Sequence, residues 1–189
     1  MTHLTETHSK ALDELIDRRM DRQMERRHVF DGEASALIDL VRYTSPDADM
    51  VPVGMWDGEA LVAAFVLWWA APQDGWTIEE RQERTLLVSL AHTHPEYRRL
   101  GRVLTPWLRD YAARQPTPPA WVRCAVRVPH LALYLHDACG WQNVRAVEFT
   151  GRRALHLLQH APAKSETLWS LIRSDSELAP SRSEQEKPA

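Results

Sequence analysis

The chain has 189 residues, which suffices for one domain with a sizeable core and is too short for two ordinary domains. Hydrophobic residues make up 44% and charged residues 26%, a balance typical of a folded protein. The net charge of −3 argues against a nucleic-acid-binding protein. Two cysteines in a chain of this size do not suggest a disulfide framework.

From the sequence we expect neither a membrane-spanning segment nor an export signal. Its longest apolar stretch, residues 61–71, is too short to span a bilayer. The first residues show no basic region followed by an apolar run, which is the pattern of a signal peptide. We therefore expect a cytoplasmic protein without a membrane partner.

The first part of the chain predicts two helices. Apolar residues recur at helical spacing from Ser9 to Arg27, with charged residues between them. A second helix is expected to begin near Asp31, which would serve as its N-cap. The turn-forming residues 44–47 end it.

Three strands are expected next. The runs Met50–Trp56 and Ala60–Ala70 flank an Asp57-Gly58 pair, a strong hairpin signal. The second run is apolar on both faces, as in a central strand covered by helices. Thr85–His92 predicts another buried strand, and the charged segment Glu79–Arg84 before it is interpreted as a solvated loop.

The second half predicts helices alternating with strands. In chain order, we expect a helix over 101–114, a strand over 121–128, a helix over 129–139 and a hairpin of strands 144–150 and 153–158. This order predicts an α+β domain over residues 1–162. Residues 163–189 predict a short amphipathic helix and a disordered polar tail.

The segment 95–104 joins a buried strand to an amphipathic helix. The first N–H groups of a helix lack partners within it and lie at the positive end of its dipole, so they bind phosphate readily. Gly101 allows the backbone to approach a ligand closely. Arg98, Arg99 and Arg102 add cations that oppose the dipole. The segment therefore predicts an anion-binding site.

This segment resembles the acetyl-CoA motif of the GNAT superfamily, in which Gln or Arg is followed by two residues, Gly, one residue and then Gly or Ala. Arg98 and Gly101 match it, and Val103 stands at the position of the small residue. Residues 132–141 resemble the second motif of that family, in which alanine precedes tyrosine and then Gly-Phe or Gly-Trp. The order of elements over 50–158 also resembles the GNAT fold.

The resemblance implies a divergent GNAT member with a mixed, mostly antiparallel sheet of about six to seven strands, flanked by helices. It implies acetyl-CoA as acyl donor and an amine, on a small molecule or a protein, as acceptor. The pantetheine arm would pair with the strand end formed by Ala91, His92 and Thr93. The pyrophosphate would lie on Arg98, Arg99, Leu100, Gly101, Arg102, Val103 and Leu104.

Acyl transfer to an amine needs a base for the ammonium proton and an acid for the leaving thiolate. His136 stands where the family has tyrosine and is a candidate acid, unless it only packs beside Cys139. Tyr134, two residues earlier and about 200° around the helix, is expected to face away from the site. His92 and His94 are candidate bases, although histidines at strand ends often have structural roles.

Two departures from the family pattern keep a second function open. Val103 is bulkier than glycine or alanine, and a histidine, His136, stands in place of the tyrosine. Both departures favour a non-catalytic GNAT-like module that binds a ligand or a partner. No pair of histidines and cysteines shows the spacing of metal ligands, so no metal is expected. Exposed C-terminal strands would allow a homodimer.

Overall fold

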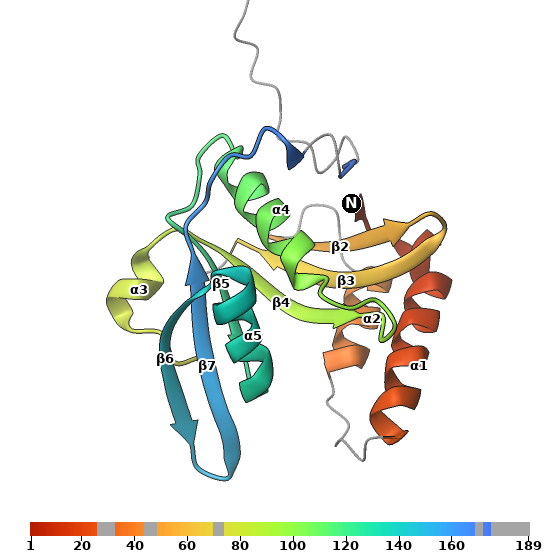
Figure 1. Ribbon diagram of the computed structural model, residues 1–189, viewed down its shortest axis with the longest axis horizontal. Helices are drawn as coiled ribbons and strands as arrows, with labels where there is room; N and C mark the ends of the chain where they lie inside the picture. The colour runs from red at the N-terminus through yellow and green to blue at the C-terminus, as the bar shows by residue number, and fades with distance from the viewer. Residues whose placement is uncertain (26–32, 44–48, 70–73, 169–171, 175–189) are drawn as a thin grey trace, which may run out of the picture.

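The computed structural model describes residues 1–25, 33–43, 49–69, 74–168 and 172–174 (Figure 1). The strands are β1 (Thr2–His3), β2 (Met50–Asp57), β3 (Ala60–Trp68), β4 (Thr85–Thr93), β5 (Trp121–Val126), β6 (Gln142–Phe149) and β7 (Arg152–His160). The helices are the 3-10 helix η1 (Glu6–His8), α1 (Ser9–Glu25), α2 (Glu33–Tyr43), α3 (Ile78–Gln82), α4 (Gly101–Ala113) and α5 (Pro129–Cys139). In the described ranges, no helix is both long and apolar enough to cross a membrane.

All seven strands form one sheet in the order β1-β2-β3-β4-β5-β7-β6. Within the described residues, β4 and β5 run parallel and every other neighbouring pair runs antiparallel. A parallel pair needs a crossover between its strands, and α4 supplies it here. The sheet therefore changes from antiparallel to parallel pairing at its centre.

Helices cover both faces of the sheet, as the side chains of β3 demonstrate. Phe65 and Leu67 pack in a core shared with α4 and α5, whereas Ala64 and Val66 pack in a core shared with α1 and α2. Successive strand residues point to opposite faces, so the two helix pairs lie on opposite sides of the sheet (Figure 1). The expectation of a strand that is buried on both faces is confirmed.

Local signals placed several boundaries correctly. The predicted hairpin forms, with Asp57 opposite Ala60 across the turn. Helix α5 begins at Pro129 and ends before Gly140, whose φ of 75° lies in the left-handed region that favours glycine. The strand β1 was not expected, because two residues are too few to show an alternating pattern.

Some expectations fall outside the described residues. They include the end of the first helix at Arg27, the N-cap at Asp31 and most of the polar tail. Residues 161–165 have no regular structure, and the centre of the amphipathic helix expected there, 169–171, is not among the described residues. The division of the chain at residue 162 stays a prediction.

The prediction of a loop over Glu79–Arg84 is wrong for residues 79–82, which lie in α3, whereas most side chains of the segment are solvent-exposed, as predicted. Thr77 begins this helix with a capping box, in which its hydroxyl accepts from the Glu80 N–H and its own N–H donates to Glu80 Oε2 at 2.8 Å. The same carboxylate binds the Arg145 guanidinium through both oxygens. The hydrogen bonds from Arg145 are the main reason that the pKa of Glu80 falls to about 2.

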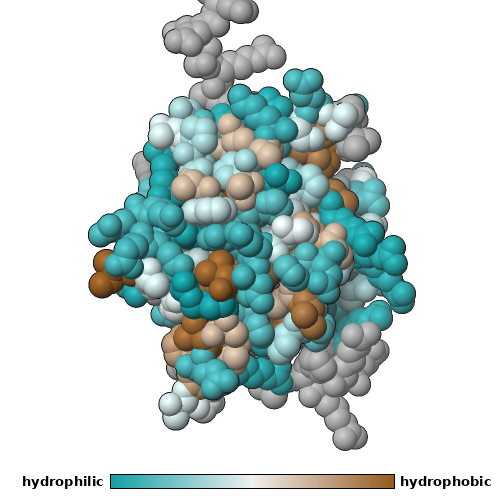
Figure 2. All heavy atoms as spheres, turned by 60° about the vertical axis from the view of Figure 1, so that its left-hand side comes forward, coloured by the Kyte–Doolittle hydropathy of each residue, from teal (hydrophilic) through white to brown (hydrophobic). Residues whose placement is uncertain are grey.

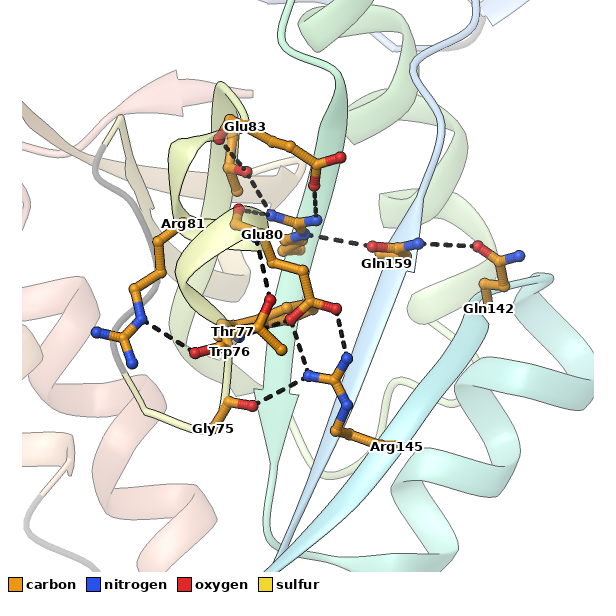
Figure 3. A network of polar contacts seen from close by, with 11 residues as sticks. Gly75, Trp76, Thr77, Glu80, Arg81, Glu83, Gln142, Arg145 and Gln159 are labelled. Atoms are coloured by element: carbon orange, nitrogen blue, oxygen red, sulfur yellow. Dashed lines mark hydrogen bonds and ion pairs between the residues drawn. The ribbon is translucent and has the colours of Figure 1, made fainter.

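A buried guanidinium ties α3 to the sheet (Figure 3). Arg123 of β5 is 1% exposed. Its Nη1 donates to the Glu80 carbonyl at 2.6 Å and to the Thr85 hydroxyl at 3.1 Å, and its Nη2 pairs with the Glu83 carboxylate. The guanidinium carbon lies 4.4 Å from the centre of the Trp76 ring. Since Thr85 begins β4, Arg123 holds the start of β4 beside β5.

The strand β6 forms one edge of the sheet. Its pairing with β7 shifts register between Asn143 and Arg145 and again between Val147 and Phe149. Such irregularities interrupt the row of backbone groups that a second chain would pair with. Figure 2 shows that the face turned toward the viewer is mostly hydrophilic, with separate apolar spots. The homodimer expected from the sequence stays a prediction.

Replacing Arg123 by alanine should destabilise the fold strongly. The Glu80 carbonyl, the Thr85 hydroxyl and the Glu83 carboxylate would lose the guanidinium that donates to them. We therefore expect the free energy of unfolding to fall by about 2–4 kcal/mol. Urea denaturation followed by tryptophan fluorescence measures the change. Arg42→Ala is the control, since Arg42 pairs with Asp13 at 2.9 Å with both side chains at least 40% exposed. That pair should contribute at most about 1 kcal/mol to stability. Equal losses of stability in both variants would contradict the structural role given to Arg123.

Candidate functional site

The strands β4 and β5 pair only along their first halves. Parallel pairing joins Thr85–Val88 to Trp121–Cys124, and β4 then continues to Thr93. β5 pairs with β7 on its other side. Among the described residues, no strand pairs with the second half of β4 on the side where β5 has left it. The central sheet is therefore open at this point.

A bulge lies in β4 where the two strands part. Val66 of β3 lies opposite Ser89, whereas Ala64 lies opposite His92, so β4 has one residue more than β3 over this stretch. Leu90, within the bulge, has a φ of 49°, a left-handed conformation that residues other than glycine rarely adopt. The bulge therefore changes the direction of β4 just as its pairing with β5 ends.

The open side of β4 exposes backbone groups. The His94 N–H donates to the Val62 carbonyl of β3 at 2.8 Å. Peptide groups along a strand point alternately to its two sides, so those of Thr93 and Ala91 point away from β3. An extended ligand chain could pair with them there. These are residues for which the sequence predicted contacts with a pantetheine arm.

The turn into α4 forms a concave set of N–H groups. Arg99 has a φ of 65°, and Leu100 follows in the right-handed helical region. A left-handed residue followed by a right-handed one directs successive N–H groups toward a common point, an arrangement called a nest that binds anions. The N–H groups of Leu100 and Gly101 have no acceptor among the described residues. The positive end of the α4 dipole adds to their attraction for an anion.

Three cationic side chains surround this nest. Arg98, Arg99 and Arg102 are all exposed, and within the described ranges none of their guanidinium groups is paired with a carboxylate. Unpaired cations at the positive end of a helix are unfavourable unless an anion is bound. Val103, the bulky residue in the motif, is 36% exposed, so it is not packed into the core. Leu100 is buried and anchors the turn against β3.

The expectation that Tyr134 faces away from this site is wrong. A Cβ atom added to Gly101 would lie 2.8 Å from Tyr134 Cε1 and 3.1 Å from Cys139 Sγ. The ring therefore extends across from α5 to the start of α4, which a count of residues around one helix did not anticipate. Gly101 is needed for this approach of a side chain, and not only for the approach of a ligand. Trp141 keeps the two helices together through a 2.8 Å hydrogen bond from Nε1 to the buried Thr105 hydroxyl.

The Tyr134 hydroxyl is buried and has no hydrogen bond of normal geometry within the described part of the chain. The Arg102 N–H and the Cys139 thiol lie beside it. Burial, followed by the Cys139 thiol, raises the pKa of Tyr134 above its ordinary value. The hydroxyl is therefore protonated at neutral pH and is able to donate a proton.

His136 lies at the end of α5, on its outer side. Its Nδ1–H donates to the Trp141 carbonyl at 2.8 Å, and its side chain is 53% exposed. The ring thus satisfies a carbonyl just beyond the helix. The catalytic role that the sequence suggested for His136 stays a prediction.

His92 is only 6% exposed and lies beside the bulge. Its Nδ1 is 2.9 Å from the Leu90 carbonyl. A carbonyl oxygen only accepts hydrogen bonds, so Nδ1 carries the hydrogen and Nε2 carries the lone pair of the neutral ring. Nε2 is then the atom that would accept a proton if His92 acts as a base.

The cysteines lack the character of nucleophiles. Burial raises the pKa of Cys124 to about 12, so its thiol stays protonated. Cys139 packs against the start of α4. Among the described residues, no three histidine, cysteine, aspartate or glutamate side chains are grouped so that they could hold a metal ion.

No family model and no curated protein matches the sequence. Solved structures are similar over most of the chain. An aminoglycoside N(6')acetyltransferase from Legionella pneumophila superposes with a TM-score of 0.59 at 7% identity, covering 90% of this chain and 94% of that one. An acyl-CoA N-acyltransferase from Pseudomonas aeruginosa gives 0.53 at 18% identity, with 84% and 93% covered. The chain has the GNAT fold.

A probable acetyltransferase from Staphylococcus epidermidis is also similar, with a TM-score of 0.56 at 12% identity over 85% of this chain and 97% of that one. The predicted fold class is therefore confirmed, a mixed and mostly antiparallel α+β sheet flanked by helices. In this chain the GNAT fold places the open side of β4 directly before the nest at α4. These two features were predicted as parts of one coenzyme site.

Replacing Gly101 by alanine should force Tyr134 away from the start of α4. We expect the free energy of unfolding to fall by about 1–3 kcal/mol, the usual cost of overpacking. Chemical denaturation measures it. In a Tyr134→Ala background the same replacement should cost much less, because the atom that it would meet is gone. Equal costs in both backgrounds would contradict the contact.

Proposed function

We propose that this chain is an acyl-CoA-dependent N-acyltransferase that moves an acetyl group from acetyl-CoA to a primary amine. The observation that carries the proposal is the open side of β4, followed directly along the chain by the nest at α4. The open side offers backbone groups to an extended chain, and the nest offers N–H groups and cations to a diphosphate. Coenzyme A has these two parts in this order.

The residues fit this coenzyme in their chemistry. The peptide groups of Ala91 and Thr93 would pair with the amides of the pantetheine arm. The N–H groups from Arg99 to Leu104 would bind the pyrophosphate, and the exposed guanidinium groups beside them would neutralise its charge. The solved structures of acetyltransferases with the same fold support an acyltransferase function.

The proposed reaction is direct attack of the amine on the thioester carbonyl. The new N–C bond forms, the C–S bond breaks, the amine loses a proton and the coenzyme leaves as its thiol. We assign proton removal to Nε2 of His92, which carries the lone pair. The geometry favours Tyr134 as the proton donor to the thiolate, because its protonated hydroxyl is buried at the start of α4. His136 is the alternative donor.

A non-catalytic ligand-binding module is the second candidate function. The observation in its favour is the packing of Tyr134 against Gly101, where the ring lies close to the N–H groups that would bind phosphate. If the ring does not move aside, it would limit the approach of a diphosphate. Coenzyme binding and turnover, measured separately, distinguish the two functions.

Acetyl-CoA should stabilise the protein against thermal unfolding. At a hundred times its dissociation constant, a ligand adds about 2.7 kcal/mol. Replacing Arg98, Arg99 and Arg102 together by glutamine should raise the dissociation constant at least about tenfold, since charged hydrogen bonds contribute about 1.5–3 kcal/mol each. Arg109→Gln on the same helix is the control and should bind normally. No thermal shift at millimolar coenzyme would exclude the enzyme.

Phenylalanine replacements should identify the acid. We expect Tyr134→Phe to lower kcat about 100-fold or more, the usual contribution of general acid catalysis, with little change in the binding of acetyl-CoA. His136→Phe should leave kcat nearly unchanged. A thiol-release assay with an amine acceptor measures both. The reverse pattern would assign the acid to His136, and no effect of either replacement would remove both from this role.

A further inference from the structure

The segment from His94 to Leu100 joins the end of β4 to the nest at α4, and it is anchored at three points. The first is a backbone contact, since the His94 N–H donates to the Val62 carbonyl of β3 at 2.8 Å. The second is Tyr97, and the third is Leu100, which is buried against β3. Arg99, whose left-handed φ forms the nest, lies between the second anchor and the third.

Tyr97, the middle anchor, is held through its backbone, its ring and its hydroxyl. Its N–H donates to the His94 carbonyl at 3.2 Å and closes a turn. Its ring lies edge-on to the His94 ring, with 5.2 Å between the ring centres, and packs in the cluster that holds Leu100. Its hydroxyl donates to the Asp57 carboxylate at the turn between β2 and β3. This hydrogen bond is the main reason that the pKa of Tyr97 lies above its ordinary value.

His94 gives the Tyr97 ring a fixed support. It is 5% exposed, so its own position is set by the residues packed around it. The Arg18 guanidinium of α1 donates from Nη1 to Nε2 of His94 at 3.0 Å, and the imidazole accepts. Tyr97 is therefore fixed relative to α1 through His94 and relative to β2 and β3 through Asp57.

The two residues between the anchors have no such support of their own. Arg98 and Arg99 are exposed, and they alone separate Tyr97 from Leu100 in the chain. The φ of 65° at Arg99 is unfavourable for a residue other than glycine and persists only where the surrounding structure imposes it. Because neither arginine is packed into the core, the constraint on Arg99 must come from the anchors on its two sides.

We propose that Tyr97 is a positioning residue for the coenzyme, which keeps Arg99 left-handed so that the N–H groups of Leu100 and Gly101 converge on the diphosphate. The inference rests on the proposed function. Tyr97 need not touch the coenzyme to act in this way. When fewer molecules keep the binding conformation, the apparent dissociation constant rises by the inverse of the remaining fraction. Loss of Tyr97 should therefore weaken binding although every N–H group and arginine of the nest is still present.

Calorimetric titration with coenzyme A tests the proposal. We expect Tyr97→Ala to raise the dissociation constant at least about tenfold. Tyr97→Phe, which keeps the ring and loses the hydroxyl, should raise it about threefold, the effect of one hydrogen bond. Tyr43→Ala is the matched control, since Tyr43 of α2 is 79% exposed, and it should bind normally. Normal binding in both Tyr97 variants would overturn the proposal, and Tyr97→Phe alone decides if Tyr97→Ala does not fold.

A glycine at position 99 separates positioning from a general loss of stability. Glycine adopts the left-handed conformation without steric cost, so it depends less on the anchor. In an Arg99→Gly background, Tyr97→Ala should therefore raise the dissociation constant less than about threefold. Both proteins in this comparison lack the Arg99 guanidinium, so its own contribution to binding cancels. An equal factor in the two backgrounds would contradict the positioning role.

Kinetics and a smaller probe separate this proposal from the proposed function. With acetyl-CoA and an amine acceptor, Tyr97→Phe should raise KM about threefold and leave kcat nearly unchanged, because the diphosphate lies away from the reacting atoms. If coenzyme A binds but no amine is acetylated, only the proposed function fails, and the titrations with coenzyme A decide the present proposal. If coenzyme A does not bind, inorganic pyrophosphate takes its place in the titrations, with the same factors expected. Absence of pyrophosphate binding, or equal affinity in the unchanged protein and the Tyr97 variants, would then overturn the proposal.

Discussion

The strands β4 and β5 pair as parallel strands only along their first halves and separate along their second halves. The candidate site depends on this separation. Arg123 fixes the paired halves, where its guanidinium bonds to Thr85 and to the α3 backbone. Leu90 marks the point of separation, where an extra residue and a left-handed φ turn β4 aside. A sheet with regular pairing would use all its backbone groups internally, and no ligand could pair with them.

The start of α4 follows this open side of β4 along the chain and adds a cluster of backbone N–H groups. A left-handed Arg99 makes the N–H groups converge, and Gly101 allows α5 to come close. The distance between the two helices is set by side chains, with Trp141 bonded to Thr105 and the Tyr134 ring against Gly101. The Tyr134 ring and the turn at the start of α4 are therefore parts of one packed contact, so a change in the size of this ring should shift the turn.

The features that could be predicted from the sequence were those that depend on a few neighbouring residues. Pro129 and Gly140 gave the bounds of α5, and Asp57-Gly58 gave a hairpin, because each acts through its own backbone conformation. The pairing of Glu80 with Arg145 could not be predicted, since the partners are 65 residues apart and meet only in the folded chain. The direction of Tyr134 was missed for a related reason, because it depends on the position of α4. A capping pattern at Thr77 and Glu80 was present in the sequence and could have revealed α3.

The bulge in β4 also reverses which side chains face which layer. Before it, Leu86 and Val88 pack toward α4 and α5, whereas after it the even-numbered His92 and His94 lie toward α1 and α2. The extra residue is what allows this change of side, because Ser89 and His92 still lie opposite Val66 and Ala64, which point to one face. Deleting one residue within the bulge should therefore restore regular alternation and leave both histidines on the side of α1 and α2. Comparisons of chains across this point must count residues as well as match them.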